Sequence, residues 1–132
     1  MNASLPIATL SVVYAQDIQK VAAFYLRTLS LSILEEGSGF VVVGNTSLEI
    51  AVVRMASEVA ERTMISVPPQ VREGTPIKCS FWVESLRHAK AEAEATGGAI
   101  KPVASAWRWR GQLHLDGHDP EGNVVQFRSS AA

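Results

Sequence analysis

The sequence predicts an α+β fold of two tandem βαβββ modules, whose strands form a curved mixed sheet around a concave cavity. One order of elements, a strand, a helix and three strands, occurs twice along the chain, in pattern rather than in residue identity. The last strands alternate between apolar and polar residues, which is typical of a sheet with two different faces. The chain has 132 residues, of which 47% are apolar and 19% charged, and therefore suits one packed domain.

The first module is expected at residues 5–54. Residues 7–13 are rich in β-branched side chains and predict a strand. Asp17 then has the chemistry of a helix N-cap. An apolar stripe at helical spacing predicts a helix that ends near Leu29-Ser30, and its members are Ile18, Val21, Ala22, Tyr25 and Leu29. Three short strands follow, separated by glycine-containing turns, at residues 31–35, 40–43 and 48–53.

Residues 55–75 are expected to form a linker, with a short helix at 57–62. This segment combines charges, Pro68-Pro69 and Gly74 with weak periodicity. At this length a linker is expected to be functional or to contact a second subunit.

The second module, residues 76–128, repeats the order of the first. A strand at 77–83 precedes the N-cap Ser85, and Gly97-Gly98 ends the following helix. The buried stripe of this helix is expected at Leu86, Ala89 and Ala93. The remaining strands are expected at residues 99–103, 112–116 and 124–128. Because two like modules pair their sheets, we expect a concave face between them.

Composition excludes several classes of function. The formal net charge is -1, so the chain has no basic excess to bind nucleic acid or an anionic membrane. The single cysteine, Cys79, cannot form an internal disulfide, fits a cytoplasmic protein, and lies at strand spacing from Phe81, which predicts a buried structural thiol. The first residues do not resemble a secretory signal, and no apolar run approaches the roughly 20 residues that span a bilayer.

The last hairpin carries a dense set of functional groups. Its turn, Asp119-Pro120-Glu121-Gly122-Asn123, combines a side chain that bonds its own backbone with residues that preset or tolerate turn angles. The polar face of its two strands is expected to present Gln112, His114, Asp116, Gln126 and Arg128. If that face lines a concavity, it is a site.

Three segments of the chain resemble the vicinal oxygen chelate superfamily, the group of glyoxalases, bleomycin-resistance proteins and extradiol dioxygenases. They are Asp17 with Phe24-Tyr25, Leu48-Glu49-Ile50, and the Asp-Pro-x-Gly-Asn turn at 119–123. The resemblance covers residues 6–128 and implies the paired-module fold and a homodimer. The fold hosts many chemistries, so function has to be argued from the site.

Enzymes of this superfamily commonly hold one divalent metal with four side chains, and the resemblance places those positions at Leu10, Glu49, Lys78 and Gln126. Leu10 has no lone pair, Lys78 is a cation at neutral pH, and Gln126 is a weak neutral ligand. One carboxylate and one amide do not make a site for zinc, nickel or iron. We therefore expect no metal and no other cofactor, which argues against glyoxalase I, dioxygenase and fosfomycin-type chemistry.

Lys78 and Glu49 are expected to approach each other across the vacated metal position. They form either a buried ion pair without function or a site where Lys78 attracts an anionic or carbonyl oxygen of a ligand. His114 and Asp116 share strand parity with cavity-lining positions of the superfamily. The His114 imidazole is then either an acid or base, or part of an ordinary polar strand face.

Two tryptophans precede the hairpin, in a segment that we expect to be a loop. Trp107 and Trp109, with Arg108 and Arg110, either stack on a flat ligand and contact its anionic groups or anchor a dimer interface. Trp82 shares strand parity with Lys78 and is expected to point into the same cavity.

Two functions fit these residues. The first is a metal-independent, cytoplasmic binding protein of the bleomycin-resistance type, active in antibiotic resistance, which sequesters an aromatic or polyfunctional small molecule. Its ligand-binding residues are expected to be Leu10, Glu49, Lys78, Trp82, Trp107, Trp109, Arg110, His114, Asp116 and Gln126. The second is a metal-independent lyase or isomerase, with His114 as general base and Lys78 stabilising an oxyanion or enolate.

Overall fold

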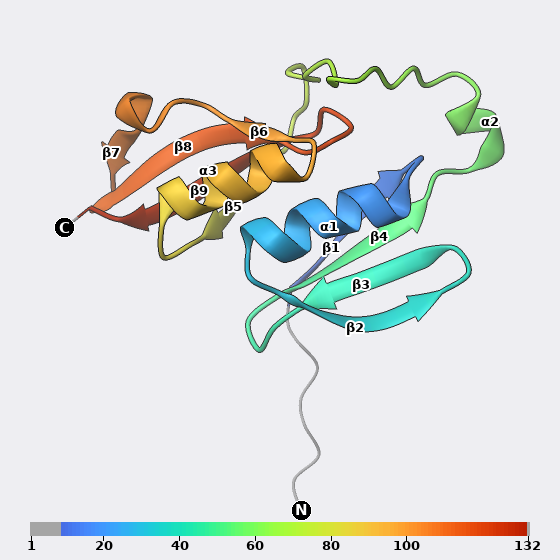
Figure 1. The fold of residues 1–132 in the computed structure, drawn as a ribbon, viewed down its shortest axis with the longest axis horizontal. Helices are drawn as coiled ribbons and strands as arrows, with labels where there is room; N and C mark the ends of the chain where they lie inside the picture. The colour runs from blue at the N-terminus through green and yellow to red at the C-terminus, as the bar shows by residue number, and fades with distance from the viewer. Residues whose placement is uncertain (1–8, 132) are drawn as a thin grey trace, which may run out of the picture.

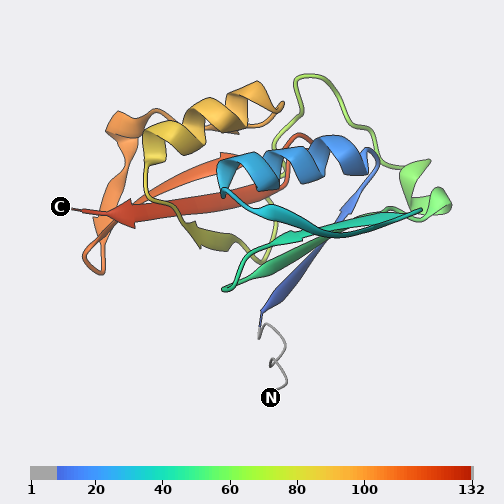
Figure 2. The same cartoon turned by 60° about the horizontal axis from the view of Figure 1, so that its bottom comes forward.

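The computed structural model describes residues 9–131 as two separate mixed sheets with the helices α1 and α3 side by side on one face of them (Figures 1 and 2). The first sheet contains β1 (Leu10–Ala15), β2 (Ser32–Gly37), β3 (Phe40–Gly44) and β4 (Glu49–Arg54) in the order β1-β4-β3-β2. The helix α1 (Ile18–Thr28) connects β1 to β2, and β1 pairs with β4 in parallel.

The second sheet repeats this topology. It contains β5 (Cys79–Trp82), β6 (Ala99–Ile100), β8 (Gln112–His118) and β9 (Val124–Ser130) in the order β5-β9-β8-β6, and β7 (Trp107–Trp109) also pairs with β8. The helix α3 (Leu86–Ala95) connects β5 to β6, and β5 pairs with β9 in parallel. The predicted α+β class and the duplicated order of elements are therefore confirmed. The residue bounds predicted for the two modules and the linker stay a prediction.

Local signals place the helices well. Asp17 Oδ1 accepts the backbone N–H of Lys20 at 3.1 Å, and Ser85 Oγ accepts that of His88 at 3.0 Å, so both predicted N-caps are confirmed. The predicted stripe of α3 is buried at Leu86, Ala89 and Ala93. The predicted helix of the linker is confirmed as a single turn, α2 (Ser57–Ala60).

Several predicted elements differ from the structure in their bounds. The first strand begins at Leu10 rather than residue 7 and extends to Ala15, while residues 7 and 8 lie outside the described residues. The strand expected at 99–103 ends at Ile100, because Pro102 has no N–H to donate to a neighbouring strand, and a turn of 3-10 helix follows at Val103–Ser105.

The expectation of a loop around the two tryptophans is wrong. Trp107–Trp109 is strand β7, and it forms a hairpin with β8 in which Trp109 lies opposite Gln112. Arg110 and Gly111 make the two-residue turn, with φ of 52° and 75°. Positive φ at both turn residues matches the twist of the paired strands, which is why such a tight hairpin can form here.

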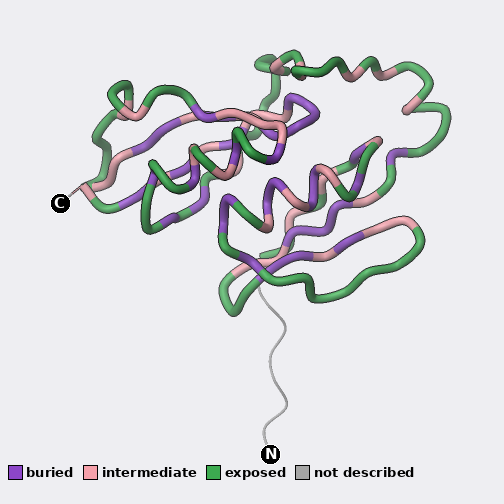
Figure 3. Tube along the Cα trace, viewed as in Figure 1, coloured by how far each residue is buried: buried purple, intermediate pink, exposed green. Residues whose placement is uncertain are grey.

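One core is shared by the two modules. The ring of Phe24 on α1 packs at 6.4 Å against Phe127 on β9, and that of Tyr25 packs at 6.4 Å against Phe81 on β5. Buried residues gather where the helices meet each other and the strands beneath them, whereas β2 and the linker are mostly exposed (Figure 3).

Within residues 9–131 no helix has the length and apolar character needed to span a bilayer.

Candidate functional site

The face of the second sheet opposite α3 carries one connected set of polar side chains. Lys78 Nζ lies 3.0 Å from Asp116 Oδ1, and Gln126 Nε2 lies 3.4 Å from the same oxygen. Gln126 Oε1 accepts a hydrogen bond from Ser80 Oγ at 2.8 Å and lies 3.1 Å from His114 Nδ1. Strand alternation on β5, β8 and β9 brings these residues to one face, as their parity predicted.

His114 belongs to this face but is buried. Its residue exposure is 3%, because the Trp107 ring stacks on the imidazole with centroids 5.7 Å apart and the Trp109 ring lies at 5.5 Å. The second ring nitrogen, Nε2, lies 3.0 Å from the carbonyl oxygen of Trp109. Both ring nitrogens of His114 are thus engaged by protein oxygens.

The expected approach of Lys78 to Glu49 is wrong. Lys78 reaches across β9 to Asp116, in its own sheet, whereas Glu49 lies opposite Leu10 in the other sheet. Within residues 9–131 the Glu49 carboxylate makes no hydrogen bond or ion pair. The Lys78 ammonium pairs with the carboxylate of Asp116, which is the nearer one, because the attraction between charges falls with distance.

The four positions that the resemblance assigned to a metal carry side chains that do not fit a divalent ion. Leu10 offers no donor atom, and the Lys78 ammonium stands beside Asp116 with its own positive charge. Gln126 Oε1 is already occupied by Ser80 and His114. Glu49 is then the remaining strong donor, and one carboxylate does not hold zinc, nickel or iron.

A pocket of about 370 Å³ opens at the end of this face beside the β7–β8 turn. Its lining is Ser80, Trp109, Arg110, Gln112, His114, Gln126 and Arg128. Four of these residues were predicted site residues. Ser80, Gln112 and Arg128 were not, although strand parity places them on the same face and could have identified them.

A second pocket of about 470 Å³ lies at the opposite end of the polar face and is lined by Lys78 and Asp116, with Glu73, Lys101 and His118 around it. His118 is the last residue of β8, is half-buried, and places Nδ1 3.0 Å from the carbonyl oxygen of Asp119.

Two predicted site residues on β1 and β4, Leu10 and Glu49, lie on the first sheet and apart from this network. Trp82 lies on β5 opposite Arg128 and is exposed. The remaining predicted residues come together on the second sheet: Lys78, Trp107, Trp109, Arg110, His114, Asp116 and Gln126.

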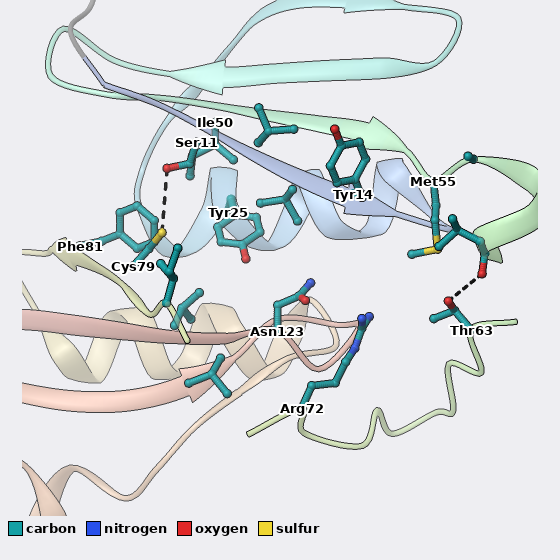
Figure 4. Close-up of a pocket in the computed structure, with 17 residues that line it drawn as sticks. Ser11, Tyr14, Tyr25, Ile50, Met55, Thr63, Arg72, Cys79, Phe81 and Asn123 are labelled. Atoms are coloured by element: carbon teal, nitrogen blue, oxygen red, sulfur yellow. Dashed lines mark hydrogen bonds between the residues drawn. The ribbon is translucent and has the colours of Figure 1, made fainter. Parts of the chain in front are cut away.

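The largest cavity, about 670 Å³, lies between the two sheets, and none of the predicted site residues lines it (Figure 4). Mostly apolar side chains of β1, β5 and β9 form its walls. Cys79 lines it as well; this thiol is only partly buried, contrary to expectation, and its Sγ lies 4.0 Å from Ser11 Oγ on β1. The sequence predicted a concave face between the modules but not the residues that line it, because these depend on how the two sheets are placed.

Tyr25 points its hydroxyl from α1 into that cavity and donates to Asp119 Oδ2 at 2.8 Å (Figure 4). Burial, and then the negative charge of Asp119, raise the pKa of Tyr25 well above its ordinary value of 10.0. The hydroxyl therefore stays protonated and acts as a donor between the modules.

No protein-family model and no curated protein matches this sequence. Solved structures do match. A glyoxalase/bleomycin resistance protein/dioxygenase family enzyme from Burkholderia phytofirmans PsJN is 16% identical with a TM-score of 0.69, over 95% of this chain and 99% of that one.

Two further solved structures are resistance proteins. The bleomycin resistance determinant of transposon Tn5 is 14% identical with a TM-score of 0.59, over 96% of this chain and 100% of that one. The fosfomycin resistance protein FosX from Listeria monocytogenes is 16% identical with a TM-score of 0.63, over 99% and 96%. The resemblance is confirmed at the level of the fold: this chain has the fold of the glyoxalase, bleomycin-resistance and dioxygenase proteins, the vicinal oxygen chelate fold.

Proposed function

We propose that the protein is a metal-independent small-molecule binding protein, which holds an aromatic or polyfunctional ligand on the polar face of the second sheet. The observation that carries this proposal is the exposed indole of Trp109, 59% accessible, at the mouth of the pocket of about 370 Å³. Exposing so large an apolar ring costs free energy that a stacked ligand recovers. The resistance proteins that share the fold support an antibiotic as the ligand.

The hydrogen-bond network favours binding over acid–base catalysis. His114 would be the base of a lyase or isomerase, but Gln126 and Trp109 engage its two nitrogens. Lys78, the proposed oxyanion stabiliser, already shares its charge with Asp116. A metal-independent lyase or isomerase remains the second candidate, because these groups are linked in one network beside a pocket, but turnover requires that network to open first.

Tryptophan fluorescence tests the binding function. Titration with a panel of flat and polyfunctional antibiotics is expected to quench the emission in wild type, with saturation, and to lose most of that response in Trp109→Leu. Trp82→Leu is the matched control, since Trp82 is also an exposed tryptophan of the second sheet but does not line the pocket. Chelator treatment is expected to leave the affinity unchanged.

Absence of saturable quenching across the whole panel counts against the proposal. Binding that disappears with the chelator and returns with nickel or zinc refutes its metal independence. Turnover of any panel compound that is lost in His114→Ala favours the lyase or isomerase.

We also propose that the protein is a cytoplasmic homodimer. Cytoplasm is supported by the lone, unpaired thiol of Cys79. A second copy is supported by a row of exposed apolar side chains on β1, which are Leu10, Val12 and Tyr14. Contact of such apolar surface with water is unfavourable, and association would remove it.

A further inference from the structure

The cations of the polar face differ in whether a carboxylate neutralises them. Lys78 is paired with Asp116 at 3.0 Å. Arg110 and Arg128 line the pocket of about 370 Å³, and neither belongs to any ion pair of the described residues. The sequence alone suggested Lys78 as the anchor for an anion, whereas the structure leaves free positive charge at the two arginines.

The two guanidinium groups reach the pocket from different strands. Arg110 follows β7, and its guanidinium carbon lies 5.5 Å from the centroid of the Trp109 ring. Arg128 on β9 donates Nη1 to Gln112 Oε1 at 3.3 Å, a long bond, and its other N–H groups have no side-chain partner within the described part of the chain. Arg108, between the two tryptophans, lies opposite Leu113 and does not line the pocket.

Among residues 9–131, no acidic side chain lines this pocket. The nearest carboxylate of the network, Asp116, lies beyond Gln126 and is held by Lys78. A cationic ligand would therefore meet two like charges without a counter-charge, while an anion would meet two donors. Guanidinium groups match the two oxygens of a carboxylate with parallel hydrogen bonds.

We propose that this pocket selects a compact aromatic carboxylate, whose ring stacks on Trp109 and whose carboxylate is bound by Arg110 and Arg128. The inference rests on the proposed binding function of the same face and specifies its ligand class. The volume supports one or two fused rings, since about 370 Å³ is near the lower end of the roughly 300–1,000 Å³ of small-molecule sites. Arg128 becomes a specificity residue, and Lys78 supports the network behind it.

Three probes with one ring system separate charge from stacking: naphthoate, naphthalenemethanol and naphthylmethylamine. By isothermal titration calorimetry, wild type is expected to bind naphthoate at least about tenfold more tightly than the alcohol, as charge-assisted hydrogen bonds predict. The amine is expected to bind more weakly than the alcohol. Raising the salt concentration is expected to reduce the difference in affinity between naphthoate and the other two probes, because these charges are partly solvent-exposed.

Charge-removing variants then locate the preference. Arg110→Gln and Arg128→Gln are each expected to lower naphthoate affinity about tenfold and to leave that of the alcohol unchanged. Arg108→Gln removes the same charge from a residue that does not line the pocket, and it is the matched control. Its affinity for naphthoate is expected to equal that of wild type. Trp109→Leu is expected to weaken all three probes, and thermal melting of each variant shows that it is folded.

Equal affinity of wild type for naphthoate and naphthalenemethanol overturns the carboxylate inference and leaves the binding function standing. An equal loss of naphthoate affinity in Arg108→Gln and Arg110→Gln also overturns the carboxylate inference, because the effect would then come from the net charge of the protein. Failure of all three probes, while an antibiotic of the fluorescence panel still quenches Trp109, also overturns the inference alone. Failure of the probes and of the whole panel overturns both the inference and the proposed function.

Discussion

At the scale of single residues, Tyr25 shows how a core position acquires a second role. Helical spacing predicts that its ring is buried, and it packs against Phe24 and Phe81. Its hydroxyl donates to the buried carboxylate of Asp119 in the other module. Asp119 also accepts hydrogen bonds from the backbone N–H groups of Glu121 and Asn123 and from the Asn123 amide.

Tyr25→Phe is expected to lower the free energy of unfolding by about 1–2 kcal/mol at neutral pH, because Asp119 loses one buried donor. The substitution is also expected to change the alkaline limb of stability. The folded state holds the Tyr25 proton more tightly than the unfolded state. The stabilisation that this group contributes to the folded state is therefore fully present below pH 10.0. It is lost as pH rises through the raised pKa of the folded state.

Urea unfolding followed by circular dichroism, at neutral pH and above pH 10.0, measures both effects. Wild type is expected to lose more stability across that interval than Tyr25→Phe. Parallel losses in the two proteins would contradict the pKa shift of Tyr25.

At the scale of elements, the turn at 119–123 joins the second module to the start of α1. The carboxylate of Glu121 accepts the backbone N–H of Gln16 at 3.0 Å and that of Asp17 at 2.8 Å. A negative charge at this place complements the positive end of the helix dipole. Gly122 has φ of +86°, and a Cβ there would collide with the backbone oxygen of Gln70. The turn therefore binds both the helix and the linker.

Glu121→Gln is expected to lower the free energy of unfolding by about 1–3 kcal/mol, because the partly buried N–H groups of Gln16 and Asp17 lose a charged acceptor. The matched control is Glu94→Gln, which removes an exposed carboxylate from its i,i+4 pair with Lys90 and is expected to cost about 0.5 kcal/mol or less. Urea unfolding of both variants measures the difference. A Glu121→Gln protein as stable as Glu94→Gln would show that the turn does not stabilise the joint between the modules.

At the scale of the whole molecule, the two sheets present unlike faces on the side away from the helices. The second sheet is polar, whereas β1 exposes 51% of Leu10, 50% of Val12 and 61% of Tyr14. An apolar row on an edge strand is a surface that association covers. The proposed homodimer follows from this asymmetry.

Light scattering after size-exclusion chromatography is expected to give twice the chain mass of 14.2 kDa. Val12→Glu is expected to yield monomers, because a charge on the apolar row opposes its burial. Met64→Glu places the same charge on an exposed apolar residue of the linker, outside the row on β1, and is expected to leave the mass unchanged. A wild-type protein that stays at the mass of one chain at every concentration would exclude the homodimer.

Most of the fold could be predicted from local patterns. The caps Asp17 and Ser85 act on backbone groups only a few residues away, and the stripe of α3 follows from helical periodicity. Strand parity likewise placed His114, Asp116 and Gln126 on one face. The strand at Trp107–Trp109 escaped prediction, because three residues are too few to show a period and the pairing with β8 supplies the evidence.

Four of the residues that line the candidate pocket were expected from the sequence, but their contacts were not. The amino-acid order establishes that no usual metal can be held at Leu10 and Lys78, since an aliphatic group and an ammonium offer a metal no lone pair under any arrangement of the chain. The partner of Lys78, the burial of His114 and the unpaired charge of Arg110 and Arg128 depend instead on distances between strands far apart in sequence. The chemistry of a side chain is set by its residue type, but its electrostatic pairing and its burial depend on the residues around it. Those neighbours are determined only by the tertiary structure.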